Sequence, residues 1–202
     1  MGYRAELFKI VDRIAVGSPT NQMTFVAGKL YVKAGAQTLV YNPKTNDIKR
    51  LDFAALADSK MVVDGINNLA VLTSDGIKSE IVHINPVTDE VVARKELTGI
   101  TLDQWGARLE YHNGNLYFNA VDENYKPMIY RYAISSEELT LAFKPESVVY
   151  LYCMGIYNGN IVICDAVDFV QSGNVYEFSP SGTQINKFKA GICPNFIFSL
   201  DF

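Results

Sequence analysis

The sequence predicts an all-β protein, a β-propeller of about four complete four-stranded blades with partial strands at both ends. The first observation behind this prediction is a recurring phrase: an apolar run, a polar turn and a second apolar run, which together are typical of a β-hairpin. The second observation is its spacing. Leu30, Leu69, Leu116 and Ile161 open equivalent strands roughly 40–50 residues apart, which is the length of one propeller blade.

The stretch 111–134 shows the hairpin most clearly. A turn at Asn113-Gly114-Asn115 leads into the apolar run 116–118, and the polar loop 122–127 separates this run from a second one at 128–132. Val, Ile, Tyr, Phe and Leu dominate the runs, while Asn, Gly, Pro, Asp and Ser fill the joints between them. Local propensity and pattern therefore agree on β-strands.

The repeats cover about 17–52, 61–97, 106–143 and 150–189, as one propeller domain over 1–202. The expected strands are 23–26, 30–33, 38–41 and 47–52, then 62–63, 69–73, 80–84 and 91–97, then 109–111, 116–120, 128–132 and 139–143, and finally 152–156, 161–164, 175–178 and 184–189. Pro43, Pro86 and Pro180 follow third strands, where a φ near −65° starts a tight turn. One short helix is expected at 52–60, because an acidic residue precedes an Ala/Leu run there.

Both ends of the chain resemble pieces of a blade. Residues 6–16 have the pattern of an outer strand, and residues 195–200 have that of an inner strand. Two organisations fit: a fragment of a longer propeller, or a compact ring whose ends share one blade and so leave no unpaired sheet edge. In the first case, two open fragments are expected to pair as a homodimer through their edge strands.

Composition excludes several classes of protein. A hydrophobic content of 49% with 20% charged residues is that of a globular chain, and a net charge of −4 without a Lys/Arg run argues against nucleic-acid binding. No apolar run reaches the roughly 20 residues of a membrane span, and no signal peptide is present. Cys153, Cys164 and Cys193 form no CxxC pair. They are interpreted as buried apolar residues, with one disulfide and one free thiol as the alternative.

A family resemblance enters with the repeat motifs GKLYV (28–32), TLVYNPKTNDIKRL (38–51), NNLAV (67–71) and EIVHINPVTDEVVARKEL (80–97). They resemble the YVTN-repeat, YncE-like β-propellers of bacterial surfaces. Residues 159–198 are similar to the final blade of the surface-lipoprotein branch found in gut anaerobes. The resemblance implies a seven-bladed, non-catalytic binding protein of the cell surface or periplasm. Some members capture corrinoids beside an outer-membrane transporter. This chain lacks the signal, the lipid-carrying cysteine and roughly three blades of that pattern.

The sequence contains no constellation that predicts catalysis, and the chain is interpreted as a non-enzyme without a cofactor. His83 lies in an alternating strand and His112 precedes a turn, and neither has a second His or Cys at ligand spacing. There is no GxSxG, no GxxxxGK[ST] and no GxGxxG that opens a helix. No metal site is predicted.

The strongest candidate for ligand contact is the loop between the second and third strands of the fourth repeat. In a propeller, such loops and the connections between blades surround one mouth of the axial channel, and binding residues are commonly carried on loops of this kind. The candidate ligand-binding residues on this face are Trp105, Tyr125, Tyr152, Asp165, Asp168, Phe169 and Gln171.

Each of these candidates has a structural alternative. Asp165 and Asp168 either accept backbone N–H bonds that fix a long loop, which is the favoured interpretation, or accept hydrogen bonds from a polar ligand. Trp105, the only tryptophan, either stacks on a planar ligand or packs between blades. The functional hypothesis is capture of a small ligand, a corrinoid if the resemblance holds. The alternative is a protein-interaction or surface-layer scaffold.

Overall fold

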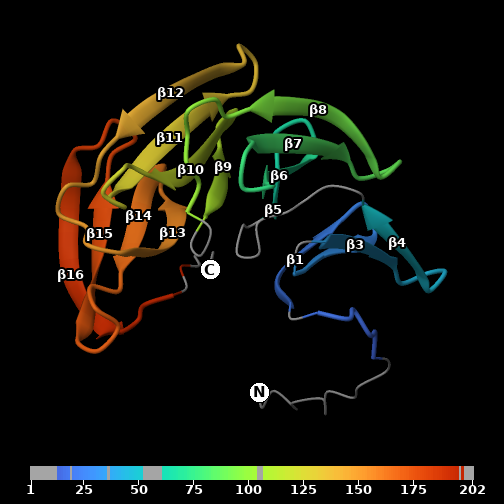
Figure 1. Ribbon diagram of the computed structural model, residues 1–202, viewed down its shortest axis with the longest axis horizontal. Helices are drawn as coiled ribbons and strands as arrows, with labels where there is room; N and C mark the ends of the chain where they lie inside the picture. Colours follow the sequence, from blue (N-terminus) through green and yellow to red (C-terminus); the bar gives the residue numbers. More distant parts are fainter. Residues whose placement is uncertain are drawn as a thin grey trace, which may run out of the picture.

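The structure, a computed structural model, describes residues 13–18, 20–35, 37–51, 61–103, 107–195 and 197 (Figure 1). This part of the chain contains sixteen strands and no helix. The strands form four separate sheets, each with four antiparallel strands in chain order. The all-β prediction with four complete four-stranded units is confirmed. None of the described segments is a helix long and apolar enough to cross a membrane.

Each sheet comprises four consecutive strands. Sheet 1 contains β1 (Thr20–Val26), β2 (Lys29–Ala34), β3 (Gln37–Asn42) and β4 (Asp47–Leu51). Sheet 2 contains β5 (Met61–Val63), β6 (Leu69–Ser74), β7 (Ser79–Asn85) and β8 (Glu90–Glu96). Sheet 3 contains β9 (Leu109–His112), β10 (Asn115–Val121), β11 (Pro127–Ala133) and β12 (Glu138–Phe143). Sheet 4 contains β13 (Leu151–Tyr157), β14 (Asn160–Asp165), β15 (Ser172–Phe178) and β16 (Gln184–Ile192).

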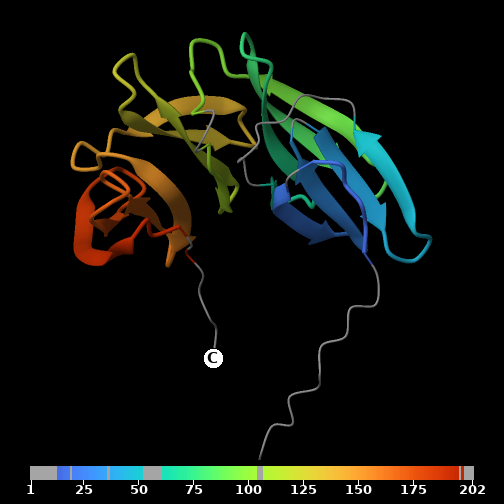
Figure 2. The same ribbon diagram turned by 60° about the horizontal axis from the view of Figure 1, so that its bottom comes forward.

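The four sheets follow one another around an arc (Figures 1 and 2). The first strand of each sheet, β1, β5, β9 or β13, lies on the inner side of the arc, and the fourth strand lies on the outer side. Sheets 1 and 4 stand at the two ends, and the arc is open between them in both views.

The central strands of sheets 2 and 3 are apolar on both faces because each of these two sheets packs between two others. Successive side chains of a strand point to opposite faces. Leu69 packs against sheet 1, where Tyr31 and Val40 belong to the same buried cluster, while its neighbour Ala70 packs against sheet 3 in a cluster that includes Leu116. The same alternation makes the near-continuous apolar runs in the sequence.

A polar contact links sheet 1 to the β7–β8 turn of sheet 2. Lys29 Nζ lies 2.6 Å from Asp89 Oδ1, and the hydroxyl of the buried Tyr31 donates a hydrogen bond to the same carboxylate. Burial, and then the neighbouring Asp89, raise the pKa of the Tyr31 phenol well above its ordinary value. The phenol therefore stays protonated and remains a hydrogen-bond donor that links the two sheets.

The two end sheets differ in how the face turned away from the rest of the arc is covered. On sheet 1, the face turned away from sheet 2 carries Met23 and Phe25, whose side chains are each 65% exposed. On sheet 4, Ile197 packs on the corresponding outer face, in a cluster with Val162 and against Gly155 of β13.

Most predicted strands agree with the observed ones within a few residues, and the largest differences, of three residues each, are at the starts of β1 and β15 and at the end of β16. Strand β15 begins at Ser172, whereas the sequence predicts a start at 175. Ser, Gly and Asn favour turns, but here Asn174 pairs with both Asp165 and Lys189, so sheet pairing overrides local preference. The predicted helix at 52–60 lies outside the described residues. Of the predicted end strands, only 13–16, Asn195 and Ile197 are described, and none of them belongs to a strand.

Candidate functional site

One edge of the arc, here called the loop face, carries the loops between second and third strands and the connections between sheets. Antiparallel order places all of these segments at the same edge, because successive strands alternate in direction. In sheet 4 this edge consists of the β14–β15 loop, residues 166–171, and the β12–β13 connection, residues 144–150. The predicted ligand loop therefore lies on this face, next to the connection that enters the same sheet.

Asp165 anchors both segments from inside the protein. Its side chain is fully buried, and Oδ1 accepts hydrogen bonds from the backbone N–H groups of Tyr150 and Val167, each at 2.9 Å. Its Oδ2 accepts a third bond from the N–H of Val149 at 3.2 Å. One carboxylate thus satisfies three donors that lie on two loops, which is the favoured structural interpretation of this residue.

Asp168 closes the β14–β15 loop at the surface. Its Oδ1 accepts the backbone N–H groups of Val170 and Gln171, and its Oδ2 accepts the side-chain amide of Gln171 at 2.9 Å. The backbone N–H groups of Gln171 and then Val170 lower the pKa of the Asp168 carboxyl, because they stabilise its charged form. Asp168 and Gln171 therefore act together on loop shape.

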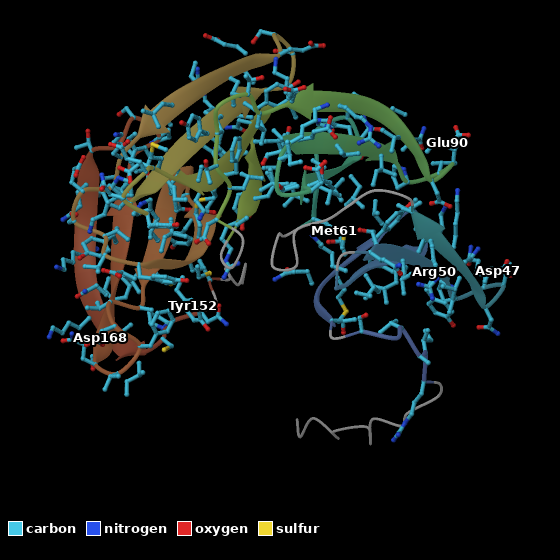
Figure 3. The ribbon with its side chains drawn as sticks, viewed as in Figure 1. Asp47, Arg50, Met61, Glu90, Tyr152 and Asp168 are labelled. Atoms are coloured by element: carbon cyan, nitrogen blue, oxygen red, sulfur yellow. The ribbon has the colours of Figure 1, made fainter. Side chains whose placement is uncertain are left out.

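Three aromatic rings, here called the aromatic cluster, contact one another beside the segments that Asp165 holds: Tyr150, Tyr152 and Phe169. The Phe169 ring lies 4.8 Å from Tyr150 and 5.4 Å from Tyr152 between centroids, in edge-to-face arrangements. The two tyrosine rings are 6.4 Å apart. Phe169 remains 44% exposed, and Val170 beside it is 77% exposed. Tyr152 and Asp168 lie at the sheet 4 end of the arc (Figure 3).

Arg108 ties the aromatic cluster to sheet 3. Its Nε donates a hydrogen bond to the backbone carbonyl of Tyr152 at 3.1 Å, across the boundary between the sheets. Its own backbone N–H donates to Oδ1 of the buried Asn119 at 2.6 Å. The position of Tyr152 is therefore set by two sheets and not by its own strand alone.

The structure brings together five of the seven predicted ligand residues, in the aromatic cluster and the loop beneath it: Tyr152, Asp165, Asp168, Phe169 and Gln171. Tyr125 lies on the β10–β11 loop of sheet 3 and is 83% exposed. Trp105 lies outside the described residues. The sequence prediction missed Tyr150 and Arg108. Tyr150 could have been found from its position two residues before Tyr152, because alternate residues of an extended chain share a face.

The open arc of sheets is similar to several solved structures of low sequence identity. A quinonprotein alcohol dehydrogenase-like protein from Bacteroides thetaiotaomicron matches with a TM-score of 0.63 and 14% identity, over 84% of this chain and 45% of that chain. The Dos1 propeller matches with a TM-score of 0.61 and 13% identity, over 86% and 48%. A catalytically inactive virginiamycin B lyase from Staphylococcus aureus, with quinupristin, matches with a TM-score of 0.62 and 15% identity, over 87% and 57%.

This chain has a β-propeller fold. Its four sheets are blades 1 to 4, and it spans about half the length of the propellers that it matches. No protein-family model matches the sequence, and no curated protein matches it. The likeness to solved structures establishes the fold alone.

The hydrogen bonds that Asp168 accepts in the loop between the second and third strands of blade 4 have equivalents in blades 2 and 3. Asp75 Oδ1 accepts the N–H groups of Ile77 and Lys78, and Asp122 Oδ1 accepts those of Asn124 and Lys126. In blade 1 the equivalent loop, which follows Ala34, has no aspartate. The loop face is thus stiffened by one repeated device in three of its four blades.

These three loop aspartates lead us to expect that the protein loses stability at acidic pH. The N–H groups of Lys78, Lys126 and Gln171 are the largest cause of the lowered pKa of Asp75, Asp122 and Asp168, respectively. Because each folded-state pKa lies below the unfolded value of about 3.9, the stabilisation is present above that pH and is lost as the pH falls through the folded-state pKa values.

We expect the thermal midpoint to fall as the pH is lowered from about 5 to 3, and the Asp75→Asn/Asp122→Asn/Asp168→Asn triple variant to show a flatter dependence over the same range. Thermal melts followed by circular dichroism measure both slopes. Asp47→Asn, at the exposed start of β4, is the matched control. Equal slopes in the triple variant and the parent would contradict this interpretation.

Metal-ligating side chains do not gather in the described part of the propeller, where no group of three or more His, Cys, Asp or Glu is placed to hold an ion. His83 is buried in blade 2, and its Nδ1 lies 3.1 Å from Oδ2 of the buried Asp64. The other oxygen of Asp64 accepts the backbone N–H groups of Ile66 and Asn68. This pair therefore fixes the β5–β6 turn.

Two hollows on the loop face lie away from the aromatic cluster. One has a volume of about 490 Å³ and is lined by residues 77–79 and 96–101 of blade 2 and the connection that follows it. A smaller one of about 90 Å³ lies between blades 3 and 4, where Asp122, Lys126, Lys144 and Glu146 are among its lining residues. The aromatic cluster lines neither of these two hollows.

Proposed function

We propose that this propeller is a non-catalytic binding module, and that the aromatic cluster holds a planar or partly planar small ligand by stacking. The single observation that carries this proposal is the exposed Phe169 ring, set edge-to-face against Tyr150 and Tyr152 on a loop that buried Asp165 fixes. Exposed rings with few torsions to freeze lose little entropy on binding, so a rigid aromatic platform favours a ligand with a flat face.

The backbone of the loop supports this proposal. Val167 and Phe169 have φ values of 57° and 66°, in the left-handed region that β-branched and bulky residues avoid. Such conformations cost about 1–3 kcal/mol each and persist only where surrounding contacts impose them, often at functional sites. Here Asp165 and Asp168 supply those contacts, and the Phe169 N–H donates to the Ala166 carbonyl at 3.0 Å.

A corrinoid is the ligand to test first. Residues 159–198, which include the β14–β15 loop, resemble a branch of surface propellers of which some members capture corrinoids beside an outer-membrane transporter. The corrin macrocycle is large and nearly flat, which fits stacking on Phe169. The carboxylates beneath the cluster are engaged by N–H groups of the protein, which supports binding without chemistry.

The test is calorimetric titration with cobalamin. We expect measurable heat of binding, and a loss of affinity of about 5- to 150-fold in Phe169→Ala and Tyr152→Ala, because stacking contacts are worth roughly 1–3 kcal/mol. Tyr157→Ala, at the β13–β14 turn on the opposite edge of blade 4, is the matched control and should leave affinity unchanged. Quenching of the single tryptophan, Trp105, gives an independent signal. Equal affinity in all three variants would contradict a site at the aromatic cluster.

The second candidate function is a protein-interaction scaffold, and the observation that favours it is the apolar end of the arc. Met23 and Phe25 on β1 share one face of blade 1 with Ile48 on β4, and all three are strongly exposed. A face of this composition suits another sheet. Absence of heat with cobalamin and with other planar ligands would favour this scaffold function.

A further inference from the structure

Cys153 and Cys164 lie directly opposite each other on neighbouring strands of blade 4. They are paired in the antiparallel register of β13 and β14, and both belong to one buried cluster with Val175. Their exposed fractions are 7% and 2%, and neither is in a disulfide. Neither takes part in the proposed ligand platform.

The register pairs the two cysteines directly across β13 and β14, close to the geometry that a disulfide needs. Directly opposed residues of an antiparallel pair have Cβ atoms about 4.5–5.5 Å apart, whereas a disulfide needs about 3.5–4.5 Å, so a small approach of the strands suffices. The neighbouring Cys153 thiol, followed by burial, raises the pKa of the Cys164 thiol well above its ordinary value.

The surroundings restrict which reagents can reach the pair. Ile197 packs in the same cluster and contacts Gly155, and Pro194 lies against Gly173, so the chain that follows β16 crosses over this face of the blade. Cys193, the third thiol, is half-buried and donates to the Phe169 carbonyl at 3.7 Å. A small oxidant is therefore favoured over a protein thiol oxidase.

We propose that Cys153 and Cys164 form a redox-active dithiol that closes a reversible cross-strand disulfide when a peroxide is the oxidant. The thiolate of Cys153, the more exposed of the two, attacks one oxygen of hydrogen peroxide and becomes a sulfenic acid, while the other oxygen leaves as water after it is protonated. The Cys164 thiol then displaces the hydroxyl group, which leaves as a second water. Two thiols and one peroxide give one disulfide and two waters.

The modification has a structural consequence for blade 4. Cys153 follows Tyr152, and Cys164 precedes Asp165, so the bond joins the strand of the aromatic cluster to the strand of its anchor. The inference stands on the register of β13 and β14 and is independent of ligand binding.

The test uses the full chain with Cys193→Ser, which leaves the pair as the only thiols. Treatment with a small excess of hydrogen peroxide is expected to lower the intact mass by two hydrogens and to remove both titratable thiols. Dithiothreitol should restore both. Peptide mapping without reduction should show one cross-linked species that contains Cys153 and Cys164.

Two controls keep the outcome decisive. Cys153→Ser and Cys164→Ser, each in the Cys193→Ser background, should gain oxygen without forming the cross-link, and circular dichroism confirms that each is folded. A folded parent that accumulates sulfinic acid at Cys153, or that keeps two free thiols after oxidation, would overturn the proposal.

Discussion

Replacing Asp165 with alanine is expected to lower the free energy of unfolding by about 3–5 kcal/mol. The carboxylate is fully buried and accepts the N–H groups of Val149, Tyr150 and Val167. Alanine leaves all three donors without this partner, and each buried donor that stays unsatisfied costs about 1–3 kcal/mol, with some relief where water enters. The effect is large because one side chain serves two segments.

Urea unfolding followed by circular dichroism measures this loss, with the slope as a check on two-state behaviour. Asp165→Asn keeps one oxygen acceptor of similar shape, so we expect a smaller loss of about 1–2 kcal/mol. Asp168→Ala, on the exposed part of the same loop, is the matched control and should change stability less than either variant. If Asp165→Ala unfolded at the same urea concentration as Asp168→Ala, the anchoring role would be wrong.

The fold could be predicted because each level of the sequence points to the same structure. The alternation around Leu69 and Ala70 supplies one apolar side chain to each neighbouring sheet, and turn residues such as Pro86 and Gly114 separate the strands. A fold can be predicted from the sequence when local preferences and global packing favour the same structure, as they do here. Ser172 to Asn174 are one exception, because pairing with β14 and β16 places residues that favour turns in a strand.

The candidate site could be predicted only in part, because its geometry depends on contacts between distant residues. The loop of Asp165, Asp168 and Phe169 is visible in the sequence as a polar interruption between two strands. The hydrogen bond from Arg108 to the Tyr152 carbonyl joins two blades, and no local sequence pattern predicts it. Likewise, no local pattern in the sequence shows that Asp165, the last residue of β14, is buried while Asp168 in the following loop is exposed.

Replacing Gly182 with alanine is expected to lower the free energy of unfolding by about 2–5 kcal/mol. Gly182 lies in the β15–β16 turn with φ at 89°, which costs an L-residue roughly 1–2 kcal/mol. A methyl group there would also lie 2.6 Å from Cγ of Phe143, the last residue of β12. Phe143 is held by the buried cluster between blades 3 and 4 and by Phe178, at 5.3 Å between rings, so it cannot yield without disturbing that boundary.

Gly76 separates these two costs, because it has the same φ of 89° but no atom within 4 Å of an added methyl group. Gly76→Ala should therefore lose only the backbone cost, about 1–2 kcal/mol, and the difference between the two variants should equal the steric cost of about 1–3 kcal/mol. Urea unfolding of both proteins at one pH measures this difference. The extra cost of Gly182→Ala arises where blade 4 meets blade 3, at Cβ and Cγ of Phe143. Equal losses at Gly76 and Gly182 would therefore mean that the turn does not press on this boundary.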